Sequence, residues 1–408
     1  MGKMKTWLTI PQPRLGVLGL LILLVITGLV TPLSLDMYTP AVPHMTEHFN
    51  TTASTVNLTL VGYFLFFAIG MLIFGPLSDK HGRKPVFLLG IVVYTVGSAL
   101  CAMASSIEAL IAFRIVEALG AGAVSAVSTA VVKDAFEESK RELVLSVMQV
   151  MFVIGPVLAP VIGAFIVQVA DWRMTFWVLA AIGAVCFLLI LLYKETLDPE
   201  DRYDGTVAGS LKNLVVAARD KGFSSFLLIV SSFNLPYMGY VAVASYVYIQ
   251  FFGLTEVAYS LYFALAALMG AVGPFVWMFA QRVMNARNFT SLMIVIALAT
   301  GIAMIVVGQL SATLFCIVFL LYTIAESCIR PYSTNILLSQ REDDTGAASS
   351  LINFAQTAAG CIGMGLVVLP WPNYVIGVGA VIVITMILAG AGWIALLKSD
   401  IKLRRIKD

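Results

Sequence analysis

The stretch "KETLDPEDRYDGTVAGSLKNLVVAARDK", residues 194–221, is the one long charged segment that interrupts a chain otherwise built from apolar runs. Of the 408 residues, 60% are hydrophobic and 12% are charged, and the mean hydropathy is +0.95. A soluble domain carries about twice this charged fraction. The apolar runs on either side reach about 18 residues or more, enough to cross about 30 Å of hydrocarbon as helices. The sequence therefore predicts an all-α integral membrane protein.

Apolar segments between charge or turn clusters predict twelve transmembrane helices, six on each side of this stretch. Their ranges are 15–43, 54–77, 85–104, 107–132, 142–169, 173–193, 223–251, 257–281, 289–309, 311–338, 347–369 and 374–397. We therefore expect an N-terminal bundle at residues 1–193, a cytoplasmic linker at 194–222 and a C-terminal bundle at 223–408. A short surface helix is expected within the linker, at 205–219.

The lysines and arginines predict the orientation of the chain. If both termini are cytoplasmic, 22 of the 25 lie on the inner side and Arg173 alone lies outside. The first apolar run is too long for a cleavable signal peptide. This inside bias accounts for the basic residues, so no nucleic-acid partner is expected. The five cysteines lie in apolar spans without paired spacing, which predicts neither disulfides nor a metal site.

Five ionisable residues remain inside the predicted spans: Asp36, Arg114, Glu117, Glu326 and Arg330. None of them can face lipid without a reason, because each costs about 2.5–3.5 kcal/mol at the bilayer centre. Asp36 and Arg114 lie at similar depth below the outer surface and meet if their helices are neighbours. Glu117 is one turn deeper on the face of Arg114. One arginine shared by two carboxylates suits coupling to protons, because separating an ion pair changes proton affinity. The alternative is a salt bridge that only fixes helix packing.

Glu326 and Arg330 form an i,i+4 pair in "IAESCIRPYS", directly before Pro331. A self-contained helical salt bridge explains this pair equally well. Their span, however, holds the position in the second half that 107–132 holds in the first. A functional pair at the same place in both halves is the second interpretation.

The stretch "GPLSDKHGRKPV", residues 75–86, joins the second and third predicted spans. Gly82 permits a sharp bend, Asp79 can accept from free amides at a helix N-terminus, and Arg83 and Lys84 can reach head groups or a facing acid. Its spacing, which begins at Gly75, resembles the inner-loop hallmark of the major facilitator superfamily. That resemblance implies two six-helix bundles around a central cavity.

Three further motifs resemble this superfamily. "RIVEALGAG" resembles the pattern of its fourth helix, except that Glu117 stands where glutamine is usual and Ala118 where glycine is usual. "GPVLAPVIGAF" resembles the antiporter motif of the fifth helix, carried by Gly155, Pro156, Ala159, Pro160 and Gly163; a kinked packing helix is the plainer interpretation. "SLDMYTPAVP" resembles the signature of the bicyclomycin and chloramphenicol resistance branch (Bcr/CflA). The resemblance implies that Asp36 is the coupling acid and Arg114 its partner.

Polar and aromatic residues of the spans predict a loosely specific cavity. The candidate lining residues are Tyr38, Asn57, Tyr63, Gln149, Phe152, Asn234, Tyr237, Tyr240, Glu326, Arg330, Asn353 and Gln356. We expect a monomeric drug:proton antiporter of a bacterial inner membrane, which contacts lipids, uses protons as coupling ion and needs no cofactor. The alternative is a proton-coupled exporter or symporter of one metabolite, such as a sugar or amino acid. No enzyme is expected, because the three histidines lie outside the spans.

Overall fold

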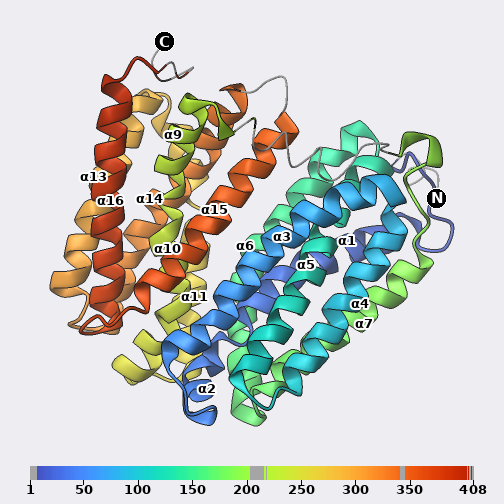
Figure 1. Cartoon of the computed structure of the whole chain (residues 1–408), viewed down its shortest axis with the longest axis horizontal. Helices are drawn as coiled ribbons and strands as arrows, with labels where there is room; N and C mark the ends of the chain where they lie inside the picture. The colour runs from blue at the N-terminus through green and yellow to red at the C-terminus, as the bar shows by residue number, and fades with distance from the viewer. Residues whose placement is uncertain are drawn as a thin grey trace. The chain divides into compact units, whose positions relative to one another are not determined.

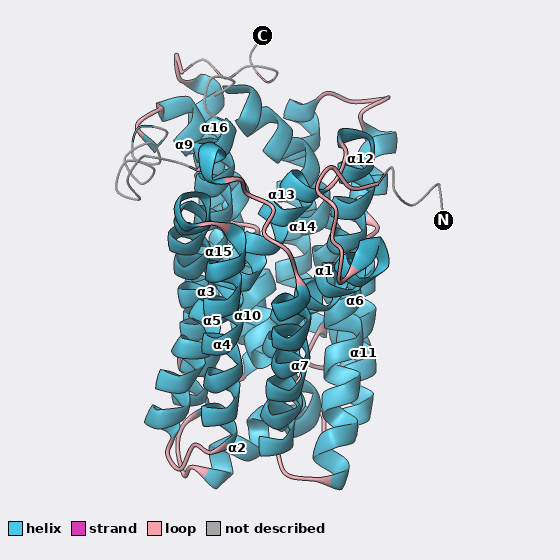
Figure 2. Ribbon diagram, turned by 90° about the vertical axis from the view of Figure 1, so that its right-hand side faces the viewer, coloured by secondary structure: helices cyan, strands magenta, loops and turns pink. Residues whose placement is uncertain are grey.

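The described part of the chain forms long helices, most of them joined by short connections (Figures 1 and 2). The structure, a computed structural model, describes residues 7–202, 216, 218–340, 345–401, 403 and 406, without the side chains of residues 152, 201 and 345–347. Twelve of its helical segments are long and apolar enough to cross a membrane. The predicted fold class, an all-α protein with twelve spans, is confirmed. The expected surface helix at 205–219 lies almost entirely outside the described residues.

The helices of the first half are α1 Gly16–Asp36, α2 Val42–His48, α3 Ala53–His81, α4 Arg83–Ala102, α5 Ile107–Ala135, α6 Glu138–Val169 and α7 Arg173–Leu192. Those of the second half are α9 Lys221–Ser231, α10 Asn234–Ser245, α11 Glu256–Gly270, α12 Gly273–Ala280, α13 Ala286–Val307, α14 Ala312–Gln340, α15 Thr345–Val367 and α16 Tyr374–Lys398. Short helical turns lie at Thr39–Ala41, Pro199–Asp201 and Tyr246–Phe251.

Three spans expected to be single helices are divided, and these expectations were wrong in detail. The segment 15–43 ends its α-helix at Asp36 and continues through a 3-10 turn into α2. Segment 223–251 breaks between α9 and α10, and segment 257–281 between α11 and α12. In each case a proline stands in the first turn of the helix that follows (Pro43, Pro236 and Pro274), where its missing N–H costs nothing.

Contacts divide the chain into two compact units. Unit 1 comprises Met1–Thr51 and Leu58–Gly209, and unit 2 comprises Thr52–Asn57 and Ser210–Asp408. In unit 1, α1 packs against α5, α6 and α7, and α4 lies between α5 and α7. In unit 2, α10 packs against α15 and α16, while α14 contacts α9, α11, α12 and α13. Functional side chains that belong to different helices can therefore meet within each unit.

A strap formed by residues 7–12 crosses one end of unit 1. Leu8 forms an isolated antiparallel bridge with Phe136, in the turn between α5 and α6. Gln12 Nε2 donates to the Lys194 carbonyl (3.0 Å), and the Lys194 amide donates back to Gln12 Oε1 (2.8 Å). This strap ties the start of the charged stretch to the bundle.

Candidate functional site

The centre of unit 1 holds a fully buried ion pair within α5. Arg114 Nη1 donates to Glu117 Oε2 at 2.8 Å, and both side chains have 0% exposure. Ser98 Oγ on α4 donates to the other carboxylate oxygen at 2.9 Å, and the Cys101 thiol lies 3.7 Å from Glu117 Oε2. The carboxylate is thereby held by donors from two helices.

Small residues bring α4 and α5 close enough for these contacts. A Cβ added at Gly97 would lie 2.6 Å from the Glu117 amide nitrogen, and one at Gly120 would lie 2.3 Å from the amide nitrogen of Tyr94. Only glycine permits so close an approach of the two backbones. The "LGAGA" run after Glu117 therefore positions the carboxylate against Ser98.

Aromatic rings cover the guanidinium of Arg114. Its Cζ lies 4.1 Å from the ring centroid of Tyr63, 4.7 Å from that of Tyr38 and 5.6 Å from that of Phe176. These rings supply cation–π attraction, which is strongest where water is excluded. Arg114 Nε and Nη2 nevertheless have no hydrogen-bond partner among the described residues. The arginine therefore has donors to spare for a second carboxylate or for water.

Asp36 is the last residue of α1 and is buried, but it does not pair with Arg114. Among the described residues, the ion pair of Arg114 is the one with Glu117. The expected contact between Asp36 and Arg114 is therefore absent from this structure. The physical reason is local: residues at i and i+3 share one face of α5, whereas Asp36 must approach from another helix toward a guanidinium covered by rings.

The small-residue face of α6 packs on the end of α1 that carries Asp36. A Cβ at Gly155 would lie 2.4 Å from the Pro32 side chain, and a Cβ at Gly163 would lie 1.8 Å from the Met37 carbonyl oxygen. The antiporter-like motif thus faces the segment Pro32–Met37. Ala159, between these glycines, is fully buried, and Pro156 and Pro160 lie inside the same helix.

Unit 2 contains a second polar cluster, which joins three helices. Arg330 Nε donates to Glu326 Oε1 at 2.9 Å within α14, and Arg330 Nη2 donates to Asn234 Oδ1 on α10 at 3.1 Å. Asn234 Nδ2 donates to the backbone carbonyl of Gln356 on α15 at 2.7 Å. The pair is therefore not self-contained. Four of the expected lining residues meet here.

The remaining expected lining residues are dispersed. Tyr240 is buried in a stack on Phe319, with centroids 3.7 Å apart, and Tyr237 is partly exposed. Asn57, in unit 2, donates to the Met364 carbonyl at 2.8 Å. Asn353 is exposed. The side chain of Phe152 lies outside the described residues.

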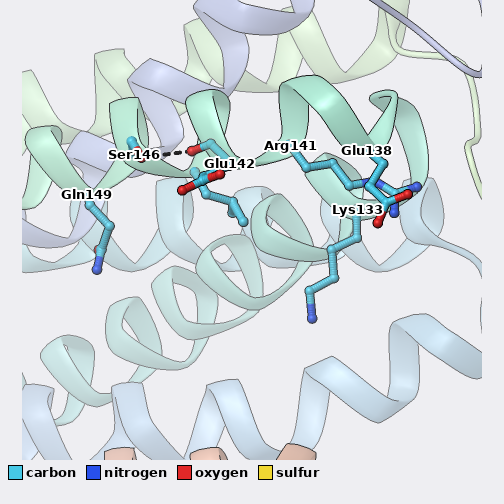
Figure 3. Close-up of a pocket in the computed structure, with 7 residues that line it drawn as sticks. Lys133, Glu138, Arg141, Glu142, Ser146 and Gln149 are labelled. Carbon is cyan, nitrogen blue, oxygen red and sulfur yellow. Dashed lines mark hydrogen bonds between the residues drawn. The ribbon is translucent and has the colours of Figure 1, made fainter. Parts of the chain in front are cut away.

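Gln149 lines a shallow pocket of about 660 Å³ between α5 and α6 (Figure 3). The full set of lining residues is Lys133, Glu138, Arg141, Glu142, Leu145, Ser146 and Gln149. Charged and polar side chains spaced by three or four residues form one stripe on α6. With 32 residues, this helix is about 48 Å long and exceeds the hydrocarbon thickness of about 30 Å. Its first turns therefore extend into water or head groups.

The motif at 75–84 folds into a charge network at the α3–α4 turn. Gly82 has φ +99° and permits the sharp bend expected of it, whereas nothing lies within 4 Å of a Cβ at Gly75. Arg83 Nε donates to Asp134 Oδ2 of α5 at 2.7 Å, and Arg83 also pairs with Asp79. Asp79 was expected to accept from helix amides and instead binds this guanidinium.

Glu195, from the charged stretch 194–221, caps the N-terminus of α4 instead of Asp79. Its Oε1 accepts from the Arg83 amide at 3.0 Å and its Oε2 from the Lys84 amide at 2.9 Å. Lys84 Nζ donates to the Tyr193 carbonyl at 2.6 Å. A carboxylate at a helix N-terminus satisfies free amides and complements the helix dipole. The start of the linker is thus part of this motif.

Sequence reasoning missed Ser98, Cys101, Phe176 and Glu195. Ser98 and Cys101 carry a signal, because polar side chains three residues apart mark one face of an otherwise apolar span. Phe176 and Glu195 carry none, since they are ordinary residues of their segments. Their roles arise from contacts with residues that are far away in the sequence.

Comparisons with known proteins agree with this architecture. The family model described as Major Facilitator Superfamily matches residues 24–364. An "Uncharacterized MFS-type transporter YdgK" of Bacillus subtilis (strain 168) is 27% identical over 396 residues, which cover 96% of this chain and 97% of that protein. The "Multidrug resistance protein MdtL" of Escherichia coli O139:H28 (strain E24377A / ETEC) is 26% identical over 360 residues, 86% of this chain and 87% of the relative.

A solved structure supports the fold alone. The bacterial homologue of the human lysosomal transporter Spinster, in its inward-facing and unoccupied conformation, superimposes with a TM-score of 0.74 at 14% identity. The match covers 92% of this chain and 96% of that chain.

Proposed function

The chain belongs to the major facilitator superfamily and is a multi-pass membrane transporter, and on that premise we propose that it exports amphipathic drugs in exchange for protons. Members of this superfamily are transporters and not enzymes, and membership confirms the prediction that this protein is not an enzyme. The antiporter is proposed to be of the Bcr/CflA type, with phenicol-like or bicyclomycin-like compounds among its substrates. The distant relative named as a multidrug resistance protein supports this choice.

The observation that carries the proposal is that only one of the three guanidinium nitrogens of Arg114 has a hydrogen-bond acceptor among the described residues. Glu117 takes one of its nitrogens, while Nε and Nη2 are buried without a partner among the described residues. Buried donors that lack acceptors are costly, so a nearby acceptor that can approach is favoured. Asp36 is that acceptor in the proposed cycle. It holds the coupling proton while it is apart from Arg114 and releases the proton when the two meet.

The packing of α1 on α6 supports a movement of Asp36 toward and away from Arg114. At Gly155 and Gly163, α6 contributes no side chain of its own to the contact with the segment Pro32–Met37. Small-residue contacts of this kind allow one helix to shift on another at little steric cost. The α-helix also ends at Asp36, where a change of backbone direction is easiest.

The proposed setting is a bacterial inner membrane, with both termini cytoplasmic. The lysine and arginine bias supports this orientation. The proposed transporter is a monomer in contact with lipids, takes no cofactor besides protons and binds no nucleic acid.

Transport by everted membrane vesicles tests the proposal. Vesicles that contain the wild type should take up a phenicol or a lipophilic cation when a proton gradient is imposed. Asp36→Asn should abolish this uptake, while Asp198→Asn, an exposed aspartate outside the spans, should leave it unchanged. Wild-type uptake rates in the Asp36 variant would refute the proposal.

A second candidate function is proton-coupled transport of a single metabolite. The Glu326–Arg330 pair favours it, because an acid and a base side by side can hold a zwitterion such as an amino acid. Uptake of one compound from a panel of phenicols, cations, sugars and amino acids would favour this candidate. Uptake of several unrelated compounds would favour the first.

A further inference from the structure

The guanidinium of Arg330 is only partly used by the protein. It has five N–H donors, of which Nε binds Glu326 and Nη2 binds Asn234. Nη1 makes no hydrogen bond within the described part of the chain, and 48% of the Arg330 side chain is exposed. The Nε–Nη2 edge is therefore occupied, while the end of the fork formed by Nη1 and the second N–H of Nη2 stays open.

This open end lies at membrane depth. Arg330 is ten residues before the last residue of α14, Gln340, which places it about 15 Å from that end of the helix. A charged group at this depth cannot be left in lipid, because the cost of about 2.5–3.5 kcal/mol or more has to be offset. In a membrane, the exposed half of the side chain is therefore expected to face water inside the protein rather than lipid.

The orientation of the Arg330 guanidinium is fixed by the protein before any ligand binds. Asn234 Nδ2 is bound to the Gln356 carbonyl, so its Oδ1 has to point toward Arg330. Glu326 is 6% exposed and holds Nε from one turn earlier on the same helix. Two acceptors on different helices thus hold the guanidinium in place, which lowers the entropic cost of binding a further group.

We propose that the open end of Arg330 is an anion subsite, which takes a carboxylate group of the transported molecule. A planar carboxylate matches two parallel N–H donors of a guanidinium. The inference rests on the proposed transport function and adds to it: of two amphipathic molecules that differ in this group alone, the one that carries a carboxylate should bind more tightly than the uncharged one. Glu326, on the other edge of the guanidinium, opposes this binding only through repulsion between the two carboxylates.

Equilibrium binding with a matched pair of probes tests this subsite. The probes are a dansyl-labelled amphipathic carboxylate and its methyl ester, titrated onto the purified full chain in nanodiscs of neutral lipid. The wild type should prefer the carboxylate by about tenfold, as expected for a charge-assisted hydrogen bond. Arg330→Gln should remove this preference and leave the affinity for the ester unchanged. Arg287→Gln, an exposed arginine of the same unit, is the control and should behave as the wild type.

A second variant separates recognition from folding. Glu326→Gln keeps an oxygen that can accept from Arg330 Nε but removes the negative charge that repels a bound carboxylate, so the affinity for the carboxylate probe should rise several-fold. A purely structural salt bridge predicts no such gain. The subsite is refuted if Arg330→Gln retains the carboxylate preference, or if Glu326→Gln binds that probe no more tightly than the wild type.

An anionic lipid head group is the competing source of an anion for Arg330, and the composition of the nanodisc separates it from substrate. Loss of the preference in nanodiscs that contain phosphatidylglycerol would assign the anion to a lipid head group and overturn the assignment to substrate. The binding assay needs no gradient, so its outcome is independent of the uptake test on Asp36. A carboxylate preference without proton-driven uptake would refute the antiport proposal while leaving the anion subsite standing.

Discussion

Arg114 Nη1 lies 2.8 Å from Glu117 Oε2, and both side chains are completely buried within unit 1. A buried ion pair contributes little net stability, because desolvation offsets the attraction. Breaking it is different, since the remaining charge is left without compensation. The pair is therefore a sensitive point of the unit, whichever role it has in transport.

Replacing Glu117 should destabilise the protein. Glu117→Leu leaves Arg114 as an unpaired buried cation, so the free energy of unfolding should fall by about 3–5 kcal/mol. Glu117→Gln keeps an acceptor and should cost less. Equilibrium unfolding in mixed micelles measures the change. Glu108→Leu, at an exposed position in the first turn of α5, is the control; equal stability of the two leucine variants would contradict the prediction.

Gly163 should not tolerate a methyl group. A Cβ there would lie 1.8 Å from the Met37 carbonyl oxygen, so α1 and α6 have to separate. Gly163→Ala should lower the free energy of unfolding by about 1–3 kcal/mol through overpacking. Gly75→Ala, where a Cβ meets nothing within 4 Å, should be neutral or stabilise α3 by about 0.5–1 kcal/mol. The prediction fails if both variants unfold alike.

Removing the Glu195 carboxylate should loosen the start of α4. Glu195→Ala leaves the amides of Arg83 and Lys84 without their acceptor, and losing a cap costs about 0.5–2 kcal/mol. Hydrogen exchange of these two amides should accelerate. Glu200→Ala, an exposed acid of the same segment, should leave it unchanged. Unaltered protection in the Glu195 variant would show that another group caps the helix.

The strap should protect the start of the charged stretch. Gln12→Ala removes both hydrogen bonds that join Gln12 to the backbone of Lys194. Trypsin should then cleave after Lys194 faster than in the wild type, since cleavage requires local opening. The matched control is Gln149→Ala, which replaces an exposed glutamine of the same unit. Equal cleavage rates in all three proteins would mean that the strap is not what holds Lys194.

Sequence by itself determined that the chain spans a membrane twelve times. A span is recognised from about 20 consecutive, mostly apolar residues, and this property does not depend on which other helices pack against it. It also singled out the buried charges, since ionisable residues stand out within apolar runs. The i,i+3 and i,i+4 spacings predicted the ion pairs that form among the five ionisable residues of the spans, Arg114 with Glu117 and Arg330 with Glu326.

Tertiary structure decided what joins different helices. Arg114 pairs with Glu117 and not with Asp36. Glu195, and not Asp79, caps the N-terminus of α4. Asn234 accepts a hydrogen bond from Arg330, which already pairs with Glu326. Tertiary structure also divided three spans near prolines whose positions alone did not show whether a helix kinks or stops. Such outcomes depend on how closely two backbones approach and on which acceptor lies nearest to a donor. Those distances are properties of packing between segments far apart in the chain, and no local pattern contains them.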